Sequence, residues 1–210
     1  MKLSLAKTIF EASFDSQIAN REARDADRTI PYAVATMGIG KTSMVQQISA
    51  ERDWGLYILS LASMDAAEVN GIIALLDGEA HRVMPFWLRR IHEMAASHEV
   101  VILFLDELPQ APVANMNVGR QIINELRWGE FDLPHNVVLC AAGNRMSDRA
   151  GTNNMPSHLK DCLMFLPIDP DVEDAIAYMV ANGVHEDVTG FLRARPEFAV
   201  KFDRDVFFFF

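Results

Sequence analysis

Uninterrupted apolar runs of strand length recur along the chain, and segments with helical periodicity lie between them. The runs occupy residues 32–36, 56–61, 100–105, 137–142 and, more weakly, 164–168. Because a strand that is buried on both faces needs apolar residues at every position, continuous runs of this kind are typical of parallel sheets. The segments between them, residues 41–52, 85–97 and 112–128, predict helices. This alternation predicts a doubly wound α/β sheet.

The two ends of the chain have a different texture from the middle. Residues 1–17 predict an amphipathic helix, and residues 172–182 and 185–195 predict two more, with a third starting at Pro196. We therefore expect an α/β core over residues 1–168 and a short helical appendage over residues 169–210, with Asp169 and Asp171 at the hinge. Four aromatic residues, Phe207–Phe210, end the sequence. Such an apolar terminus indicates that the natural domain has been cut short here.

Composition narrows the class of protein. The 210 residues are 50% apolar and 23% charged, which is ordinary globular usage. A net charge of −10 argues against nucleic acid as a partner, because proteins that bind the phosphate backbone usually carry the opposite sign. No window approaches the roughly 18 apolar residues of a membrane span. Cys140 and Cys162 form no disulfide framework, so we expect buried thiols in a cytoplasmic protein.

The strongest local motif is the glycine-bearing segment from Ala35 to Thr42, between a predicted strand and a predicted helix. This is the context that a phosphate-binding P-loop requires. Gly38 and Gly40 permit backbone angles that turn successive N–H groups toward a phosphate. Lys41 would reach the β- and γ-phosphates, and the Thr42 hydroxyl would bind Mg²⁺. The strict motif has glycine where this chain has Ala35, which adds one methyl group.

Polar residues follow two of the buried strands. Asp106 and Glu107 end the run at 100–105, and Asn144 follows the run at 137–142. Ligands of open α/β sheets bind outside the carboxyl ends of the strands, so we expect all three residues beside the P-loop. Asp106 would hold Mg²⁺, Glu107 would deprotonate the attacking water, and Asn144 would hydrogen-bond the γ-phosphate. Taken alone, Asp106 and Glu107 could be two solvated acids at the end of a strand, and Asn144 could be an ordinary turn asparagine.

Together these segments resemble the AAA+ ATPases. The sequence around them is more similar to the MoxR-like branch of that family. The similarity runs from about Thr29 to Asp203 and is carried by the segments 37–43, 63–71, 85–88, 104–112, 141–159 and 182–197. It implies a P-loop NTPase fold, a three-layer sandwich with a mainly parallel sheet, followed by a partial helical lid. It also implies a Walker A loop at 35–42, a Walker B pair at 106–107 and a sensor-1 asparagine at 144. The implied nucleotide-binding residues are Gly38, Ile39, Gly40, Lys41, Thr42, Ser43 and Asp106.

The resemblance further implies an ATP-driven homo-oligomeric ring, a hexamer when nucleotide is bound, that remodels a client protein. In this family the partner is typically of the von Willebrand factor A type. The implied cofactors are ATP and Mg²⁺, with Thr42 and Asp106 as metal ligands and Lys41, Glu107 and Asn144 as catalytic residues.

Two departures from the family pattern leave an alternative open. Cys162 stands where the family carries an arginine finger, and no sensor-2 arginine is visible. An arginine finger contributes about 10³- to 10⁵-fold in rate, which a neutral or anionic cysteine cannot supply. Lys160 lacks the planar fork, and nothing in the sequence compels Arg145 or Arg149 to substitute. The alternative function is an ATP-binding switch with little hydrolysis. A relative of helicase loaders or replication initiators is a third possibility, which the acidic balance disfavours.

Overall fold

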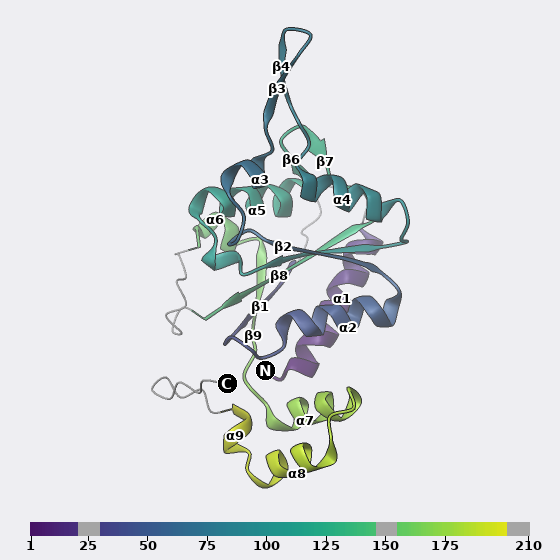
Figure 1. The fold of residues 1–210 in the computed structure, drawn as a ribbon, viewed down its shortest axis with the longest axis vertical. Helices are drawn as coiled ribbons and strands as arrows, with labels where there is room; N and C mark the ends of the chain where they lie inside the picture. Colours follow the sequence, from purple (N-terminus) through teal and green to yellow (C-terminus); the bar gives the residue numbers. More distant parts are fainter. Residues whose placement is uncertain (21–29, 146–154, 201–210) are drawn as a thin grey trace.

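Five parallel strands form the central sheet of the molecule, in the order β2-β5-β8-β1-β9 (Figure 1). The structure is a computed structural model and describes residues 1–20, 30–145 and 155–200. The strands are β1 Ile30–Ala35, β2 Gly55–Ser60, β5 Val101–Asp106, β8 Val137–Asn144 and β9 Leu163–Pro167. Each predicted strand is confirmed within two residues at either end. Strand β5, which has a neighbour on each side, is buried at five of its six positions, as its continuous apolar run predicts.

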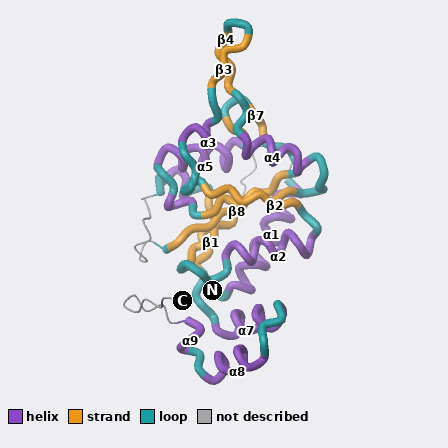
Figure 2. The backbone as a smooth tube through the Cα atoms, viewed as in Figure 1, coloured by secondary structure: helices purple, strands orange, loops and turns teal. Residues whose placement is uncertain are grey.

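Helices cover both faces of the sheet and complete a three-layer sandwich (Figure 2). One face packs against α1 Leu3–Ala19 and α2 Lys41–Arg52, whose buried residues include Phe10, Phe14 and Ile48. The other face packs against α4 Phe86–Ala95 and α5 Val113–Glu125, together with the short α3 Ala66–Asn70. The predicted α/β P-loop fold class is therefore confirmed, and so is the N-terminal helix.

Helix α1 also completes part of the sheet. Its buried Gln17 side chain accepts a hydrogen bond from Leu139 N (2.7 Å) and donates one to Leu139 O (2.9 Å). Leu139 lies two residues before β8 begins to pair with β1, at Ala141 and Tyr32. The Gln17 amide therefore replaces a strand neighbour for a buried backbone N–H and C=O, which would otherwise cost free energy.

The predicted helix over residues 112–128 is too long. Helix α5 ends at Glu125, and Leu126 adopts a left-handed conformation (φ 51°) that ends the helix. The next residues form strand β6, Arg127–Trp128, which pairs with β7, Phe131–Asp132, in a small hairpin. Apolar periodicity alone did not reveal this end, because Leu126 and Trp128 still face the same hydrophobic core as the helix.

A second hairpin, absent from the predicted elements, projects away from the body of the protein (Figure 1). It pairs β3, Ile73–Leu76, with β4, Glu79–Arg82. Its turn consists of Asp77 and Gly78, both with positive φ (53° and 85°). Asp-Gly is a preferred sequence for the type I′ hairpin turn, so this dipeptide was the signal that could have predicted it.

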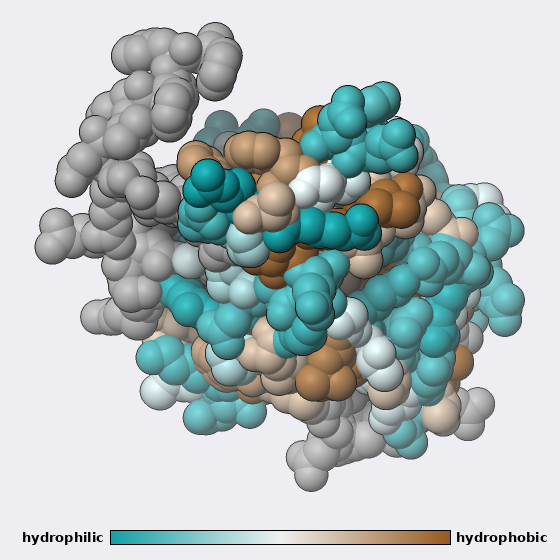
Figure 3. All heavy atoms as spheres, turned by 90° about the horizontal axis from the view of Figure 1, so that it is seen from below, coloured by the Kyte–Doolittle hydropathy of each residue, from teal (hydrophilic) through white to brown (hydrophobic). Residues whose placement is uncertain are grey.

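The C-terminal helices, α7 Val172–Ala181, α8 Glu186–Ala194 and α9 Glu197–Val200, lie apart from the sheet beyond the start of α1 (Figure 1). They bear out the three helices expected after Asp169, whereas the boundary between two domains stays a prediction. Hydrophilic residues mix with scattered hydrophobic ones on this side of the molecule (Figure 3). The exposed apolar side chains of α7–α9 include Val180, Val188, Phe191 and Phe198.

Two short helical elements lie next to strands of the central sheet. A 3₁₀ turn, η1 Leu108–Gln110, follows β5, and α6 Ser157–Lys160 precedes β9.

Cys140 is buried and Cys162 is only partly buried, so the expectation of buried thiols holds for Cys140 alone. Both cysteines are free. Within the described residues, no helix has the length and apolarity to cross a bilayer.

Candidate functional site

The predicted motifs meet at the carboxyl edge of three adjacent strands. Asp106 ends β5, Asn144 ends β8, and the glycine-bearing loop follows directly after β1. In the register of β1 and β8, Ala35 lies opposite Asn144. Neighbouring parallel strands end at the same edge, so Asp106 and Asn144 arrive beside the loop although they lie 64 positions after Thr42 and 103 positions after Lys41 along the chain.

The loop after β1 has the backbone geometry of a phosphate cradle. Gly38 and Gly40 have φ values of 79° and 95°, which favour glycine. Gly40 is the N-cap of α2, and no side chain caps its first N–H groups. Those N–H groups and the positive end of the helix dipole are what an anion binds. Ile39 packs against the core beneath α1, and Ser43 is half-buried in the first turn of α2.

Lys41 joins this loop to the neighbouring strand. Its side chain is 9% exposed. The ammonium group donates to the backbone oxygens of Ala35 (3.3 Å) and Thr36 (3.0 Å) and to Asn144 Oδ1 (2.9 Å). The charge is therefore held at the mouth of the loop by acceptors that a phosphate oxygen would replace. The predicted phosphate lysine and the predicted sensor are in direct contact.

Thr42 and Asp106 form a second contact across the same edge. Thr42 Oγ1 donates to Asp106 Oδ2 (2.9 Å), and the other carboxylate oxygen accepts from Glu107 N (2.9 Å). A hydroxyl and a carboxylate side by side are oxygen donors of the type that Mg²⁺ prefers. Mg²⁺ keeps several waters and takes phosphate oxygens as ligands, so this two-residue donor set fits Mg²⁺ bound together with a nucleotide.

Glu107 occupies a strained position at the edge of the site. It is exposed, and its φ of 53° places a non-glycine residue in the left-handed region. Such conformations cost free energy and concentrate at functional sites. The turn that follows is held by a hydrogen bond from Gln110 N to Glu107 O (2.9 Å).

Sequence reasoning missed the role of Gly143, which precedes Asn144. A Cβ at this position would lie 2.4 Å from Pro109 Cδ and 2.3 Å from Tyr32 Oη. Only glycine therefore lets the turn after Glu107 pack directly on β8. The Ala-Ala-Gly-Asn sequence at 141–144 was the signal from which close packing at Gly143 could have been predicted.

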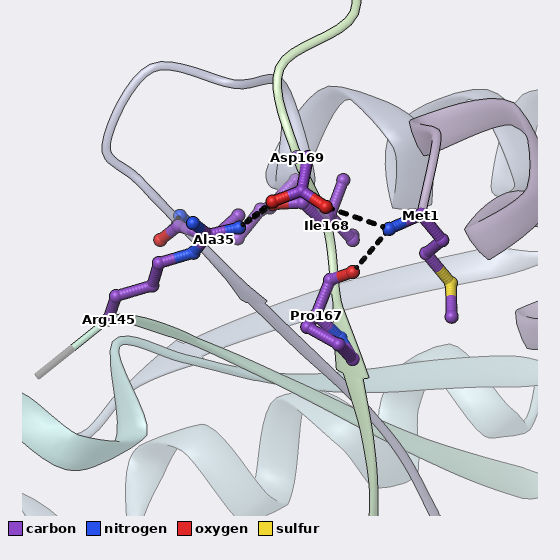
Figure 4. Close-up of polar contacts among 7 residues, drawn as sticks. Met1, Ala35, Arg145, Pro167, Ile168 and Asp169 are labelled. Atoms are coloured by element: carbon purple, nitrogen blue, oxygen red, sulfur yellow. Dashed lines mark hydrogen bonds and ion pairs between the residues drawn. The ribbon is translucent and has the colours of Figure 1, made fainter.

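Cys162, which stands in the arginine-finger slot, and the cations considered in its place have different surroundings. Cys162 donates from Sγ to His158 O (3.2 Å), and Lys160 is exposed. Arg145 points along the sheet edge to Ile168 O and the Asp169 carboxylate (Figure 4). Arg149 lies outside the described residues.

Comparison with known proteins agrees with this geometry. Residues 32–158 match the model of the "ATPase family associated with various cellular activities (AAA)". The chain belongs to the AAA family of ATPases. The matched region contains the loop after β1, the Asp106–Glu107 pair and Asn144.

Among solved structures, the AAA chain is similar to the P216G mutant of RuvB from Thermotoga maritima. The match has a TM-score of 0.49 and 15% sequence identity, and it covers 82% of this chain and 50% of that one. The AAA chain thus corresponds to about half the length of RuvB. No curated protein matches the sequence significantly.

Proposed function

We propose that this AAA protein binds ATP together with Mg²⁺ and hydrolyses it. The observation that carries the proposal is the pair of contacts across the sheet edge, from Lys41 to Asn144 and from Thr42 to Asp106. These hydrogen bonds support the proposal, because they join the residues to which we assign phosphate binding, metal binding and sensing of the γ-phosphate. Members of this family hydrolyse ATP and commonly assemble into rings.

Binding would use groups that the loop already orients. The N–H groups at the start of α2 and the Lys41 ammonium would hold the β- and γ-phosphates. Thr42 and Asp106 would hold Mg²⁺, which when bound neutralises charge on the phosphate oxygens. Asn144 would turn its amide toward the γ-phosphate and the attacking water.

In the hydrolytic step, Glu107 would accept a proton from the water as the water oxygen bonds to the γ-phosphorus. The bond from that phosphorus to the β–γ bridging oxygen breaks, and its electron pair leaves with ADP. The exposed Glu107 carboxylate is placed for this role at the rim of the loop, with its backbone fixed by Asp106.

The first test compares nucleotide binding and phosphate release in variants. Lys41→Ala should weaken ATP binding by at least tenfold, because a charge-assisted contact to phosphate is lost. Lys7→Ala is the matched control, since Lys7 pairs with Glu51 Oε1 (2.7 Å) on α1 and α2 rather than at the loop. Unchanged ATP affinity in Lys41→Ala would refute the proposal.

Finer features rest on the resemblance and remain part of the proposal. We infer a MoxR-like protein of the cytoplasm whose residues 169–210 are a partial helical lid. We further infer a nucleotide-dependent hexameric ring that remodels a client protein, with a von Willebrand factor A-type partner. Native mass spectrometry with and without ATP tests the ring, and a monomer in both conditions would contradict it.

A second candidate function is an ATP-binding switch with negligible turnover. Cys162 favours it, because a thiol that donates to a helix carbonyl cannot stabilise charge on a phosphoryl group in a neighbouring subunit. Phosphate release with and without Cys162→Arg separates the two functions. A large gain supports the switch, whereas brisk turnover that Glu107→Gln abolishes supports the ATPase.

A further inference from the structure

Arg145 connects the candidate nucleotide site to the base of the C-terminal helices. It directly follows Asn144, the residue that contacts Lys41. Its Nη2 atom donates to Ile168 O (2.7 Å) and to the Asp169 carboxylate, at the point where the chain leaves β9 (Figure 4). Because β1 lies between β8 and β9 in the sheet, this side chain crosses the strand end from which the phosphate loop starts.

The two partners of Arg145 differ in burial. Ile168 is fully buried, and its N–H donates to Val34 O (2.8 Å), so it is fixed to the sheet. The Asp169 side chain is 64% exposed, and it begins the short link to α7 at Val172. Its carboxylate also pairs with the N-terminal ammonium of Met1 (3.1 Å), and its N–H donates to Met1 O (2.9 Å). Arg145 thus spans the junction between the buried end of the sheet at Ile168 and the exposed link that begins at Asp169.

The C-terminal helices have further polar tethers to the start of α1. Lys2 Nζ pairs with Asp171 Oδ2 (3.0 Å), and Ser4 N donates to Asp174 Oδ2 (2.9 Å). These tethers hold α7 but do not touch the strand that carries Asn144. Contacts between exposed charged groups are individually weak, so small changes at the hinge can shift the orientation of α7.

We propose that Arg145 is a positioning residue that couples the state of Asn144 to the orientation of the C-terminal helices. The proposal rests on the proposed ATP binding. When Asn144 exchanges Lys41 for a γ-phosphate, the end of β8 shifts, and the adjacent Arg145 carries that shift to residues 168 and 169. ATP and ADP would then differ in their effect on α7, because only ATP carries the γ-phosphate that Asn144 would contact.

By thermodynamic linkage, if the γ-phosphate changes the hinge, then the hinge contacts must change the affinity for ATP relative to ADP. Removing the Arg145 contacts should therefore reduce two quantities together. These are the ratio of the affinities for ATPγS and ADP, and the difference in α7 dynamics between the two complexes. A side chain with only a structural role would lower stability and leave both quantities unchanged.

The experiment measures ATPγS and ADP affinities in the presence of Mg²⁺ and amide hydrogen exchange over residues 172–181 in each complex. Arg145→Gln should reduce the ATPγS preference by about threefold to tenfold and remove the exchange difference. Arg145→Lys keeps the charge but not the planar fork, so we expect partial rescue. Lys2→Gln is the control, because it loosens α7 without touching β8; it should raise exchange equally in both complexes and retain the difference.

The outcomes separate this proposal from the proposed function. If the wild-type protein binds neither nucleotide, both fail. If it binds both but α7 exchange is the same in the two complexes, or if Arg145→Gln retains the wild-type difference, the coupling alone is overturned. The coupling is also overturned if Lys2→Gln removes the exchange difference between the two complexes as fully as Arg145→Gln does. Any loosening of α7 would then be enough to remove that difference.

Discussion

Glu107 has a left-handed backbone conformation, so we expect this residue to lower the stability of the fold while it serves hydrolysis. A non-glycine residue in this region costs roughly 1–2 kcal/mol, and glycine in its place costs about 0.5–1 kcal/mol of additional chain entropy. Glu107→Gly should therefore stabilise the fold by about 0.5–1 kcal/mol. Little packing is lost, because the side chain is exposed and the hydrogen bond to Asp106 comes from the backbone.

The expected signature is a more stable protein without hydrolysis. For a chain of this size, the gain corresponds to a rise in Tm of about 1–4 °C, measured by thermal unfolding of the apo protein, while phosphate release falls to background. Glu107→Gln keeps the left-handed strain, so it should lose hydrolysis with Tm unchanged.

Asp53 provides a matched control. It ends α2 in the same conformation (φ 54°), is exposed, and lies at the opposite end of this helix from the glycine-bearing loop. Asp53→Gly should raise Tm by a similar amount and leave phosphate release intact. A lower Tm in Glu107→Gly, or hydrolysis that survives both Glu107 variants, would refute the reasoning.

Two further predictions concern contacts that the sequence did not reveal. The Arg145 guanidinium and, after it, the N-terminal ammonium of Met1 hold the pKa of Asp169 below its ordinary value, so these ion pairs stabilise the hinge above about pH 4 and are lost as the pH falls through the lowered pKa. An NMR titration should show the Asp169 pKa rising toward its ordinary value in Arg145→Gln, and an unchanged pKa would contradict the assignment. Gln17→Leu should destabilise the protein by about 2–4 kcal/mol in urea unfolding, because it leaves a buried N–H and C=O of β8 without partners; a loss below 1 kcal/mol would show that this backbone finds other partners.

Sequence patterns predicted most of the sheet and its chemistry because these depend on local requirements. A strand that is buried on both faces must be apolar throughout, which made β1, β5 and β8 visible. A loop that turns N–H groups inward needs glycine, which made Gly38 and Gly40 visible. Likewise, the carboxyl-edge rule for parallel sheets was enough to expect Asp106 and Asn144 beside Lys41.

Contacts between segments far apart in the chain were decided only by the tertiary structure. Gln17 completes a strand 122 residues away, and Arg145 reaches the hinge across an intervening strand. Neither residue type signals its partner, because a glutamine on a helix or an arginine after a strand is most often solvated. Strand order and the packing of α1 bring these partners within hydrogen-bond distance, and those are properties of the assembled sheet rather than of any local pattern.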